Sequence, residues 1–437
     1  MEGRNVQLPW GQEEIQLSLP AEWQVAGTLQ PAALPPTRDA GQEVRRSLAE
    51  PIGCARLRDL ARPGMQVALV IDDGSRPTPV DCVLPAVLQE LEAAGVGREA
   101  ITLVTALGLH RPMHEEEVAQ RVGGEALAGL RWENHACDDM QRLVYLGATT
   151  RGTPVFLNRT LAQADLVVST GCIEPHIIAS FGGGYKNVLP GVAGRETIAY
   201  NHALNCTPDT FNMVGQPIER NPMRLDLEEG AAMLRPPVFI VNTVLNSALD
   251  VVRVVSGHPI AAHRAGAQVS ARLYGVPAPA PADVVIADSH PMDQDLRQGV
   301  KSLANTIRAV RPGGVHITLA RAEKGVGVFG LANRRLPLGR RALGALGPLL
   351  IRLVPRLKIQ GMGEEDPFFL YFALQAMRHC TMLLYAPTIP AGIRANLPFV
   401  EFVDSPGEAV SRAGRQLNGR SQVLIFPHGG TTYPILA

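Results

Sequence analysis

Two histidines and a lysine lie close together in the stretch of residues 171–202, which reads GCIEPHIIASFGGGYKNVLPGVAGRETIAYNH. His176 and His202 carry imidazoles that can exchange protons near neutral pH, and Lys186 carries an amine that its surroundings can make reactive. The glycines at 182–184 allow positive φ angles and let a ligand approach the main chain closely. A turn with an exposed lysine would explain any one of these residues, so only their density favours a functional site.

Two other loops carry side chains suited to holding an anion or exchanging a proton. The sequence DDGSRPT at residues 72–78 contains Asp73, Ser75 and Arg76, and a guanidinium can bind a carboxylate or phosphate through two parallel hydrogen bonds. His110 lies in a second loop, ALGLHRPM. The structural alternatives are a capped turn with a solvent-facing arginine and an isolated surface histidine.

Each of these three loops follows a run of apolar residues that predicts a buried strand. The runs at 66–72, 101–105 and 165–170 lack polar alternation, which is typical of parallel strands covered on both faces. The carboxyl ends of parallel strands lie at one edge of a sheet, where ligands bind in open α/β folds. We therefore expect the three loops to meet at one edge.

The chain has 437 residues, which exceeds what one hydrophobic core usually supports, so two domains are expected. Alternating residues between 5 and 30 predict an N-terminal hairpin, and an Asn-Ser turn joins a predicted antiparallel pair at 238–245 and 250–255. The Pro/Ala-rich segment 276–282 is predicted to be an extended linker, which separates domains at 1–275 and 283–437. Further strands that alternate with helices are predicted at 283–288, 315–319, 382–385, 399–403 and 422–426.

Composition excludes several classes of partner and location. The 41 basic and 41 acidic residues balance, so no net charge attracts nucleic acid or an anionic membrane. The six cysteines form no CxxC pair, which favours reduced thiols in a cytoplasmic protein. The N-terminus does not resemble a signal peptide, and the most apolar stretch, 343–354, is interrupted by glycine, proline and arginine. We expect neither nucleic acid nor membrane as a partner.

Common catalytic motifs are also missing from the sequence. It contains no GxxxxGK[ST] or GxSxG motif, and GGGYK lacks the context of a dinucleotide-binding GxGxxG. The spacing of His110, His176 and His202 matches neither HExxH nor a zinc finger. The remaining inventory indicates acid/base chemistry on an anionic substrate, with or without a metal.

Five segments together resemble the nickel-pincer nucleotide lactate racemase family, in the same order and with similar spacing. They are DDGSRPT, GLHRP, EPHIIASFGGGYKNVLPG, the Asn-His pair at 201–202, and the helix that carries Gln298 and Lys301. The resemblance covers nearly the whole chain. It implies two α/β domains with mostly parallel sheets, an active site in the interdomain cleft, and an isomerase that inverts a 2-hydroxy acid.

The resemblance also implies a cofactor, a pyridinium mononucleotide whose two sulfur-containing substituents hold Ni(II). Lys186 is similar to the residue to which this nucleotide is covalently attached, and His202 to the protein ligand of nickel. Enzymes that assemble the cofactor are implied as partners. The other implied cofactor-binding residues are Asp73, Ser75, Gly183, Gly184 and Phe368. Phe368 or its neighbour Phe369 stands in the region where the family has a tryptophan.

His110 and His176 resemble the family's pair of proton-transfer residues. In the implied reaction, one histidine takes the hydroxyl proton while hydride moves to the cofactor, which gives a 2-keto acid. Return of the hydride to the other face of this planar intermediate inverts the carbon. The implied substrate-binding residues are Arg76, Arg297, Gln298 and Lys301.

Arg297 departs from the family, which has a tyrosine directly before the glutamine. A second guanidinium beside the substrate suggests a dicarboxylate such as malate or another polar 2-hydroxy acid, although a solvated helix residue is the simple alternative. Two other functions are compatible with the sequence: a sugar-acid epimerase with the same cofactor, and a non-catalytic protein that binds the nucleotide or a hydroxy acid. A binding protein needs no proton-transfer pair, so His110 and His176 argue against the last.

Overall fold

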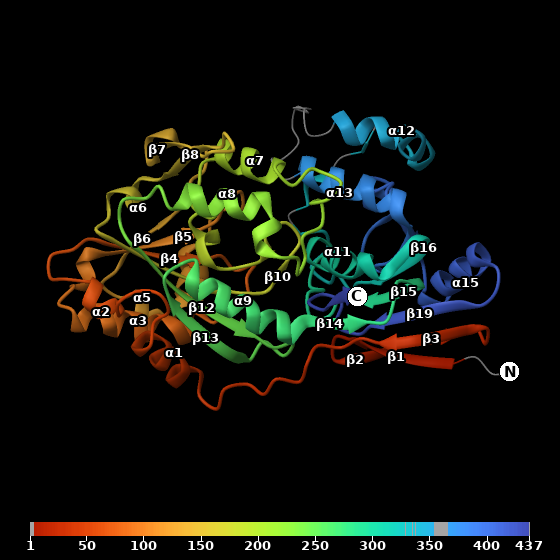
Figure 1. Ribbon diagram of the computed structural model, residues 1–437, viewed down its shortest axis with the longest axis horizontal. Coiled ribbons are helices and arrows are strands. Elements are labelled where there is room, and N and C mark those ends of the chain that lie inside the picture. The colour runs from red at the N-terminus through yellow and green to blue at the C-terminus, as the bar shows by residue number, and fades with distance from the viewer. Residues whose placement is uncertain (1–3, 328, 334, 337, 354–365, 437) are drawn as a thin grey trace. The chain divides into compact units, whose positions relative to one another are not determined.

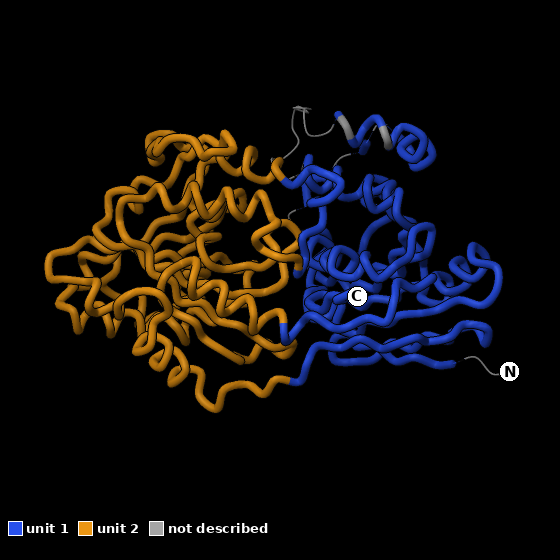
Figure 2. The backbone as a smooth tube through the Cα atoms, viewed as in Figure 1, with its two compact units in different colours: residues 1–33, 205–215, 272–437 blue, residues 34–204, 216–271 orange. Residues whose placement is uncertain are grey.

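The computed structural model describes residues 4–327, 329–333, 335–336, 338–353 and 366–436 of the chain. These residues form two compact units (Figure 2). Unit 1 comprises residues 1–33, 205–215 and 272–437, and unit 2 comprises residues 34–204 and 216–271.

This division differs from the single boundary predicted between 1–275 and 283–437, because unit 1 is assembled from separate parts of the sequence. Strand β3 (Trp23–Thr28) pairs in parallel with β19 (Ser421–Phe426), which brings the N-terminal segment to the C-terminal sheet. The predicted linker also differs from expectation. Its first residues belong to β14 (Gly275–Ala278), which pairs in parallel with β20 (Tyr433–Leu436).

Unit 2 contains a six-stranded sheet with the order β13-β12-β9-β4-β5-β6 (Figure 1). Neighbouring strands are parallel except for β12 and β13, which form the predicted antiparallel pair. The three predicted buried strands β4, β5 and β9 are therefore confirmed. The strands are β4 (Val67–Asp72), β5 (Ile101–Ala106), β6 (Arg131–Asn134), β9 (Leu166–Cys172), β12 (Val238–Leu245) and β13 (Val251–Gly257).

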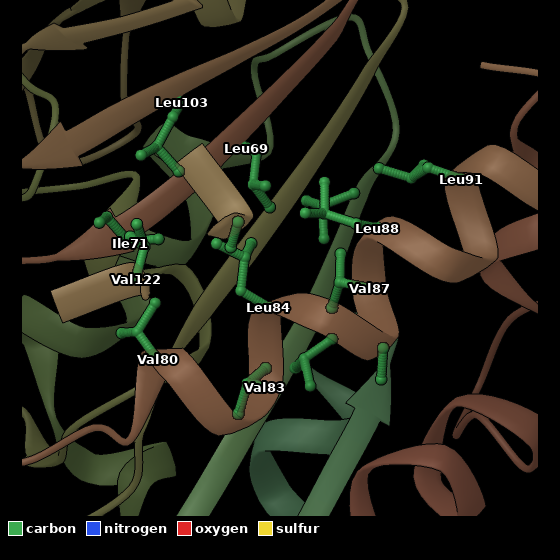
Figure 3. Close-up of a cluster of buried hydrophobic side chains, with 14 of the residues drawn as sticks. Leu69, Ile71, Val80, Val83, Leu84, Val87, Leu88, Leu91, Leu103 and Val122 are labelled. Atoms are coloured by element: carbon green, nitrogen blue, oxygen red, sulfur yellow. The ribbon is translucent and has the colours of Figure 1, made fainter. Parts of the chain in front are cut away.

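Helix α3 (Val80–Ala93) shows why these elements form. Its residues Val80, Leu84 and Leu88 recur at the spacing of one helix face and are buried near Leu69 and Leu103 of the sheet (Figure 3). The other helices of unit 2 are α1 (Ala40–Ala49), α2 (Leu57–Leu60), α4 (Glu115–Val122), α5 (Gly124–Leu127), α6 (Arg159–Gln163), α7 (Arg195–Ala203) and α8 (Pro222–Ala231), while α9 (Ala261–Tyr274) spans the boundary at residue 271. The hairpins are β7 (Leu143–Ala148) with β8 (Pro154–Asn158), and β10 (Pro175–His176) with β11 (Ser180–Phe181).

Unit 1 contains a second six-stranded sheet, β18-β17-β16-β15-β19-β3, in which all neighbours are parallel. The predicted N-terminal hairpin is confirmed as β1 (Arg4–Trp10) and β2 (Glu13–Leu19). The remaining strands are β15 (Ala282–Asp288), β16 (Val310–Leu319), β17 (Thr381–Tyr385) and β18 (Glu401–Val403). The helices are α10 (Leu296–Gly299), α11 (Lys301–Thr306), α12 (Arg340–Leu353), α13 (Asp366–His379), α14 (Ala391–Arg394) and α15 (Pro406–Leu417).

Two predictions about helices have a clear outcome. The single helix expected to carry Arg297 and Lys301 is divided at Val300 into α10 and α11, so that prediction was wrong in detail. The apolar segment 343–354 belongs to α12 as far as Leu353, and residue 354 lies outside the described residues. Within the described part of the chain, no helix is both long and apolar enough to span a bilayer.

Asp288, at the carboxyl end of β15, is a buried carboxyl group with a strongly perturbed pKa. Its side chain accepts one hydrogen bond, from the amide of His290 at 2.7 Å, and its Oδ2 has no partner among the described residues. Burial, with a smaller effect of the nearby Asp293, raises the pKa of Asp288 to about 8. The folded protein therefore keeps a proton that the unfolded chain loses at a lower pH.

We expect Asp288→Asn to stabilise the protein at pH 7 by about 1–3 kcal/mol, because the amide removes the cost of keeping this carboxyl protonated. The sign follows from the raised pKa: the contribution of Asp288 to stability falls as the pH rises from about 4 to 8. Urea unfolding at several pH values measures it. Asp283→Asn on the same strand is the control, since Asp283 pairs with Arg311 and its pKa is lowered, so its loss should destabilise slightly. Equal destabilisation by both variants would contradict the account.

Candidate active site

The loop after β4 and the loop after β5 meet through a carboxylate–imidazole pair. Asp73 pairs with His110 Nδ1 through Oδ2, and its Oδ1 accepts hydrogen bonds from the backbone amide of Ser75 at 3.0 Å and from Ser75 Oγ at 2.5 Å. Burial alone would raise the pKa of Asp73. The hydrogen bonds from His110 and Ser75, with the charge of Arg76, outweigh it and hold this pKa well below its usual value.

Arg76 connects the same region to the loop after β9. Its Nη1 donates a hydrogen bond to Glu174 Oε1 at 3.2 Å, and its side chain is 27% exposed. A further contact joins the β5 and β9 loops, because the amide of Gly108 donates to the carbonyl of Gly191 at 2.8 Å. The prediction that the three loops meet at one edge of the sheet is therefore confirmed.

Lys186 lies beside His176, with Nζ 3.1 Å from the imidazole Nε2. The other ring nitrogen of His176, Nδ1, accepts hydrogen bonds from the amides of Ile178 and Ala179, each at 3.2 Å. Since a neutral imidazole has one protonated nitrogen and one lone pair, these amides assign the lone pair to Nδ1 and the proton to Nε2.

His110 has the opposite arrangement. The Asp73 carboxylate only accepts hydrogen bonds, so His110 Nδ1 carries a proton and the neutral ring has its lone pair on Nε2. The two histidines predicted to act as a pair are thus not equivalent in this structure. His110 is arranged to accept a proton at Nε2, and His176 is arranged to donate one.

Buried polar side chains hold the backbone of residues 178–184, which precede Lys186. Arg224 Nη1 donates to the carbonyls of Phe181 and Gly183, at 3.3 and 3.2 Å. His263 Nε2 donates to the carbonyl of Gly182 at 2.9 Å, Asn242 Oδ1 accepts from the amide of Gly184 at 2.7 Å, and Asn221 Nδ2 donates to the carbonyl of Ile178 at 2.7 Å. The position of Lys186 is therefore fixed by its main chain.

Gly183 and Gly184 have structural reasons to be glycines. Their φ angles are +73° and +64°, in the left-handed region that other residues rarely adopt. A Cβ atom on Gly183 would lie 2.6 Å from Ile173 Cγ1, and one on Gly184 would lie 2.5 Å from Arg224 Nη2. Both glycines are thus required for the loop itself, whether or not a ligand approaches them.

The Arg224 guanidinium is part of a buried charge network. Its Nε donates to Glu228 Oε1 at 2.7 Å, and Arg264 binds both oxygens of the same carboxylate, each at 2.7 Å. Burial, together with the charges of Arg224 and Arg264, lowers the pKa of His263 well below its usual value, so this ring is neutral. Two guanidiniums thus share one buried carboxylate, and Glu219, whose Oε1 lies 3.7 Å from Arg264 Nε, supplies a second negative charge.

His202, the predicted nickel ligand, lies on α7 and is 3% exposed. Its Nδ1 donates to the carbonyl of Ile198 at 2.9 Å, so the neutral ring has its lone pair on Nε2. A backbone carbonyl that fixes the tautomer in this way is the usual support for a metal-binding histidine. The described residues contain no group of three or more His, Cys, Asp or Glu side chains arranged to hold a metal ion.

The predicted residues of unit 1 lie in α10, at the first residue of α11 and on α13. The Arg297 guanidinium carbon is 5.8 Å from the centre of the Phe369 ring, within the range of a cation–π contact. Gln298 Oε1 is buried and has no hydrogen-bond partner among the described residues. Phe368 is 1% exposed and packs edge-on against Phe369, which is the more exposed of the two.

The predicted site residues therefore belong to both units. Those of unit 1 are Arg297, Gln298, Lys301 and Phe368, and those of unit 2 are Asp73, Ser75, Arg76, His110, His176, Gly183, Gly184, Lys186 and His202. The expected interdomain cleft stays a prediction.

Comparisons with known proteins identify the family. Residues 10–212 match the family model described as the lactate racemase N-terminal domain. The lactate racemase of Thermoanaerobacterium thermosaccharolyticum is 30% identical over 327 residues, which cover 74% of this chain and 76% of that protein. The lactate racemase of Lactiplantibacillus plantarum is 30% identical over 325 residues, with the same coverage. The chain belongs to the lactate racemase family.

The fold agrees with this membership. The structure of the lactate racemase apoprotein from T. thermosaccharolyticum superposes with a TM-score of 0.84 at 25% identity, over 99% of this chain and 100% of that one. The resemblance drawn from the motifs, the α/β fold with mostly parallel sheets and the class of enzyme, an isomerase, are thereby confirmed.

Within this lactate racemase fold, sequence reasoning missed the residues that support the site. Glu174 stands two positions before His176 in a motif that was recognised, so its pairing with Arg76 could have been suspected. The side chains that hold the loop backbone gave no comparable signal, because they are single polar residues spread over three elements. They are Asn221, Arg224, Asn242 and His263.

Proposed function

We propose that the chain inverts the hydroxyl-bearing carbon of a 2-hydroxy acid and that it does so with a nickel-pincer nucleotide attached to Lys186. The observation that carries this proposal is the arrangement at the edge of the unit 2 sheet. There His110, with its Asp73 partner, lies in the same loop cluster as the Arg76 guanidinium. A base for a hydroxyl proton and a cation for a carboxylate are what a 2-hydroxy acid requires.

The residues of this chain fit the proposed cofactor. Lys186 supplies an amine for covalent attachment, and His202 supplies an imidazole whose tautomer leaves the lone pair on Nε2. Imidazole nitrogen is a suitable ligand for nickel. Since the described residues hold no multi-residue metal site, the nucleotide's own donor atoms would supply the other nickel ligands. When bound, the group would accept the α-hydrogen of the substrate as hydride and return it.

The side chains of the chain itself would bind the substrate and move its proton. Arg76 would bind the carboxylate, with Glu174 fixing the orientation of the guanidinium. His110 would take the hydroxyl proton at Nε2, while Asp73 orients the ring and stabilises the imidazolium that forms. His176 would serve the opposite enantiomer through its own Nε2, the atom that carries a proton in this structure.

Arg297, Gln298 and Lys301 are proposed to contact the rest of the substrate. The buried amide oxygen of Gln298 is an acceptor for a substrate hydroxyl. Arg297 replaces the tyrosine of the family, and its cation–π contact with Phe369 would hold a guanidinium in place for a second carboxylate. We therefore propose a dicarboxylate such as malate, rather than lactate, as the preferred substrate.

We expect Arg297→Tyr to lower kcat/KM for malate by roughly 10–100-fold and to leave that for lactate nearly unchanged, because a charge-assisted hydrogen bond is worth about 1.5–3 kcal/mol. Racemisation of both acids by the cofactor-loaded variants measures the effect. Arg311→Gln is a matched control, since Arg311 pairs with Asp283 on the surface of the same unit. Racemisation of lactate but not malate by the wild type would refute the dicarboxylate proposal.

The cofactor proposal is tested by intact-protein mass spectrometry with nickel analysis, on protein co-expressed with cofactor-assembly enzymes. Wild type should carry a mass increase of nucleotide size together with nickel, and Lys186→Ala should carry no covalent adduct. Lys324→Ala is the control, because the Lys324 amine is exposed and donates a hydrogen bond to Gln294. Both residues belong to unit 1, whereas Lys186 belongs to unit 2. An unmodified wild type beside active assembly enzymes would refute the cofactor proposal and favour a binding protein.

A further inference from the structure

The contact between Lys186 and His176 has a defined hydrogen-bond polarity. The amides of Ile178 and Ala179 both point at His176 Nδ1, so this nitrogen must offer its lone pair and the ring proton must be on Nε2. The Nε2 atom is 3.1 Å from Lys186 Nζ. An ammonium has three donors and no acceptor, so it cannot accept a hydrogen bond from Nε2–H. A neutral amine can accept it through its lone pair.

We propose that His176 holds Lys186 as a neutral amine, and that this contact prepares the lysine for acylation by the cofactor. His176 is then a positioning residue for cofactor attachment, in addition to its proposed part in proton transfer. The identity of the acyl donor rests on the proposed function. The inference about the state of the amine rests on the Nζ–Nε2 contact and on the two amides that assign the lone pair of His176 to Nδ1.

The turn that aims the two amides at His176 is strongly constrained. Residues Pro175–His176 and Ser180–Phe181 pair as a short hairpin, and Ser180 has a φ of +64°, which is unfavourable for a residue other than glycine. Asn221, which is fully buried, donates hydrogen bonds to the carbonyl of Ile178 at 2.7 Å and to Ser180 Oγ at 3.0 Å. An unfavourable conformation that persists under such support indicates that the direction of these amides matters.

The charged side chains of the elements around the 3-10 turn Gly184–Asn187 are engaged with other groups. Strand β4 contributes Asp72, which pairs with Arg121, and helix α8 contributes Arg224, which pairs with Glu228. Asp226 of α8 accepts hydrogen bonds from Thr149, Thr153 and Asn201. The contact with His176 Nε2 at 3.1 Å acts on the Lys186 amine directly.

The attachment step conserves atoms and electrons. The Nζ lone pair attacks the acyl carbon, the N–C bond forms, and the bond from that carbon to its leaving group breaks with the electron pair. One amine proton leaves with the departing group. No oxidant or reductant takes part, and His176 returns to its starting state.

Competitive acetylation of the protein without cofactor tests the proposal. The chain contains only four lysines, at 186, 301, 324 and 358, so peptide mass spectrometry can follow each amine separately. The probe is sulfosuccinimidyl acetate, applied from pH 6 to 11. The midpoint of each profile of acetylation rate against pH reports the protonation of that amine. Limited access of the reagent to the amine changes only the plateau rate at high pH. We expect the midpoint for Lys186 to lie one pH unit or more below that for the exposed Lys324.

Two substitutions separate the hydrogen bond from general burial. His176→Phe should raise the Lys186 midpoint by about one unit, because the ring remains and the donor is lost. His176→Gln places an amide donor near the position of Nε2 and should lower the Lys186 midpoint part of the way back to the wild-type value. This variant also tests the hydrogen bond if the phenylalanine variant does not fold. Equal midpoints for Lys186 and Lys324 in wild type, or a Lys186 midpoint that neither variant changes, would overturn the proposal. Because the probe is synthetic, this result is independent of any racemase activity.

Discussion

Replacement of His110 by alanine is expected to slow racemisation by roughly 10²–10⁴-fold, the usual contribution of a positioned general base. His110 is the histidine whose Nε2 lone pair is fixed by a carboxylate, and alanine has no group that could take a proton in the same geometry. Kcat/KM of the cofactor-loaded protein, measured from each enantiomer separately, tests this. A variant that keeps more than a tenth of wild-type turnover would contradict the assignment of His110.

Asp73→Asn tests whether the carboxylate is needed to orient His110. The amide would no longer require a proton on His110 Nδ1, so the ring could present the wrong tautomer and turnover should fall by roughly 10²-fold or more, as it does when an orienting carboxylate is lost elsewhere. The lowered pKa of Asp73 means that the carboxylate stays ionised at all pH values above 4, so its effect should not vary between pH 5 and 8. Glu117→Gln is the matched control, because it removes the charge of an exposed carboxylate that pairs with Arg111, next to His110, and leaves the pair of Asp73 with His110.

Arg224→Met is expected to reduce the free energy of unfolding by roughly 3–5 kcal/mol, the range for removing one partner from a buried ion pair. Methionine fills much of the volume but leaves the carbonyls of Phe181 and Gly183 without their donor. The glycine-rich loop should then lose its fixed position, so the variant should also acquire less cofactor. Urea unfolding and intact mass measure the two effects.

Arg264→Met is the control for this prediction. Arg264 binds the same Glu228 carboxylate, but its side chain is 24% exposed and Arg224 remains to pair with the acid. We expect a loss of roughly 1 kcal/mol, which is typical of a partly exposed ion pair. If Arg264→Met destabilised the protein as much as Arg224→Met, the importance of the backbone hydrogen bonds would be refuted.

The sequence was informative where a single physical pattern determines structure. Unbroken apolar runs predicted β4, β5 and β9, and parallel topology then predicted that the loops with Asp73, His110 and Lys186 would lie at one edge. The pairing of Asp73 with His110 did not follow from the sequence, since it depends on side-chain directions in two loops. The tautomer of His176 could not be predicted from the sequence either, because it is set by a turn with a positive φ at Ser180.

Features that depend on contacts between distant segments were the least predictable. The short strand β3 follows the N-terminal hairpin directly and contains a glycine, yet it joins β19 across most of the chain, so the discontinuous unit 1 left no local signal. The division of the expected helix at Val300 also could not be predicted, because the residues on both sides are compatible with a continuous helix. Buried polar residues such as Arg224 and Asn221 look like surface residues until the carbonyls they satisfy are known.

The most direct measurement follows the α-hydrogen through racemisation. A single enantiomer of 2-deuterated malate, and of 2-deuterated lactate, would be incubated in ordinary water with nickel-loaded protein, and the inverted product analysed for deuterium. The proposed function predicts inverted product that keeps its deuterium, because a hydrogen that moves as hydride does not exchange with water. Inverted product that has lost its deuterium, or no inversion by protein that carries the cofactor, would contradict it.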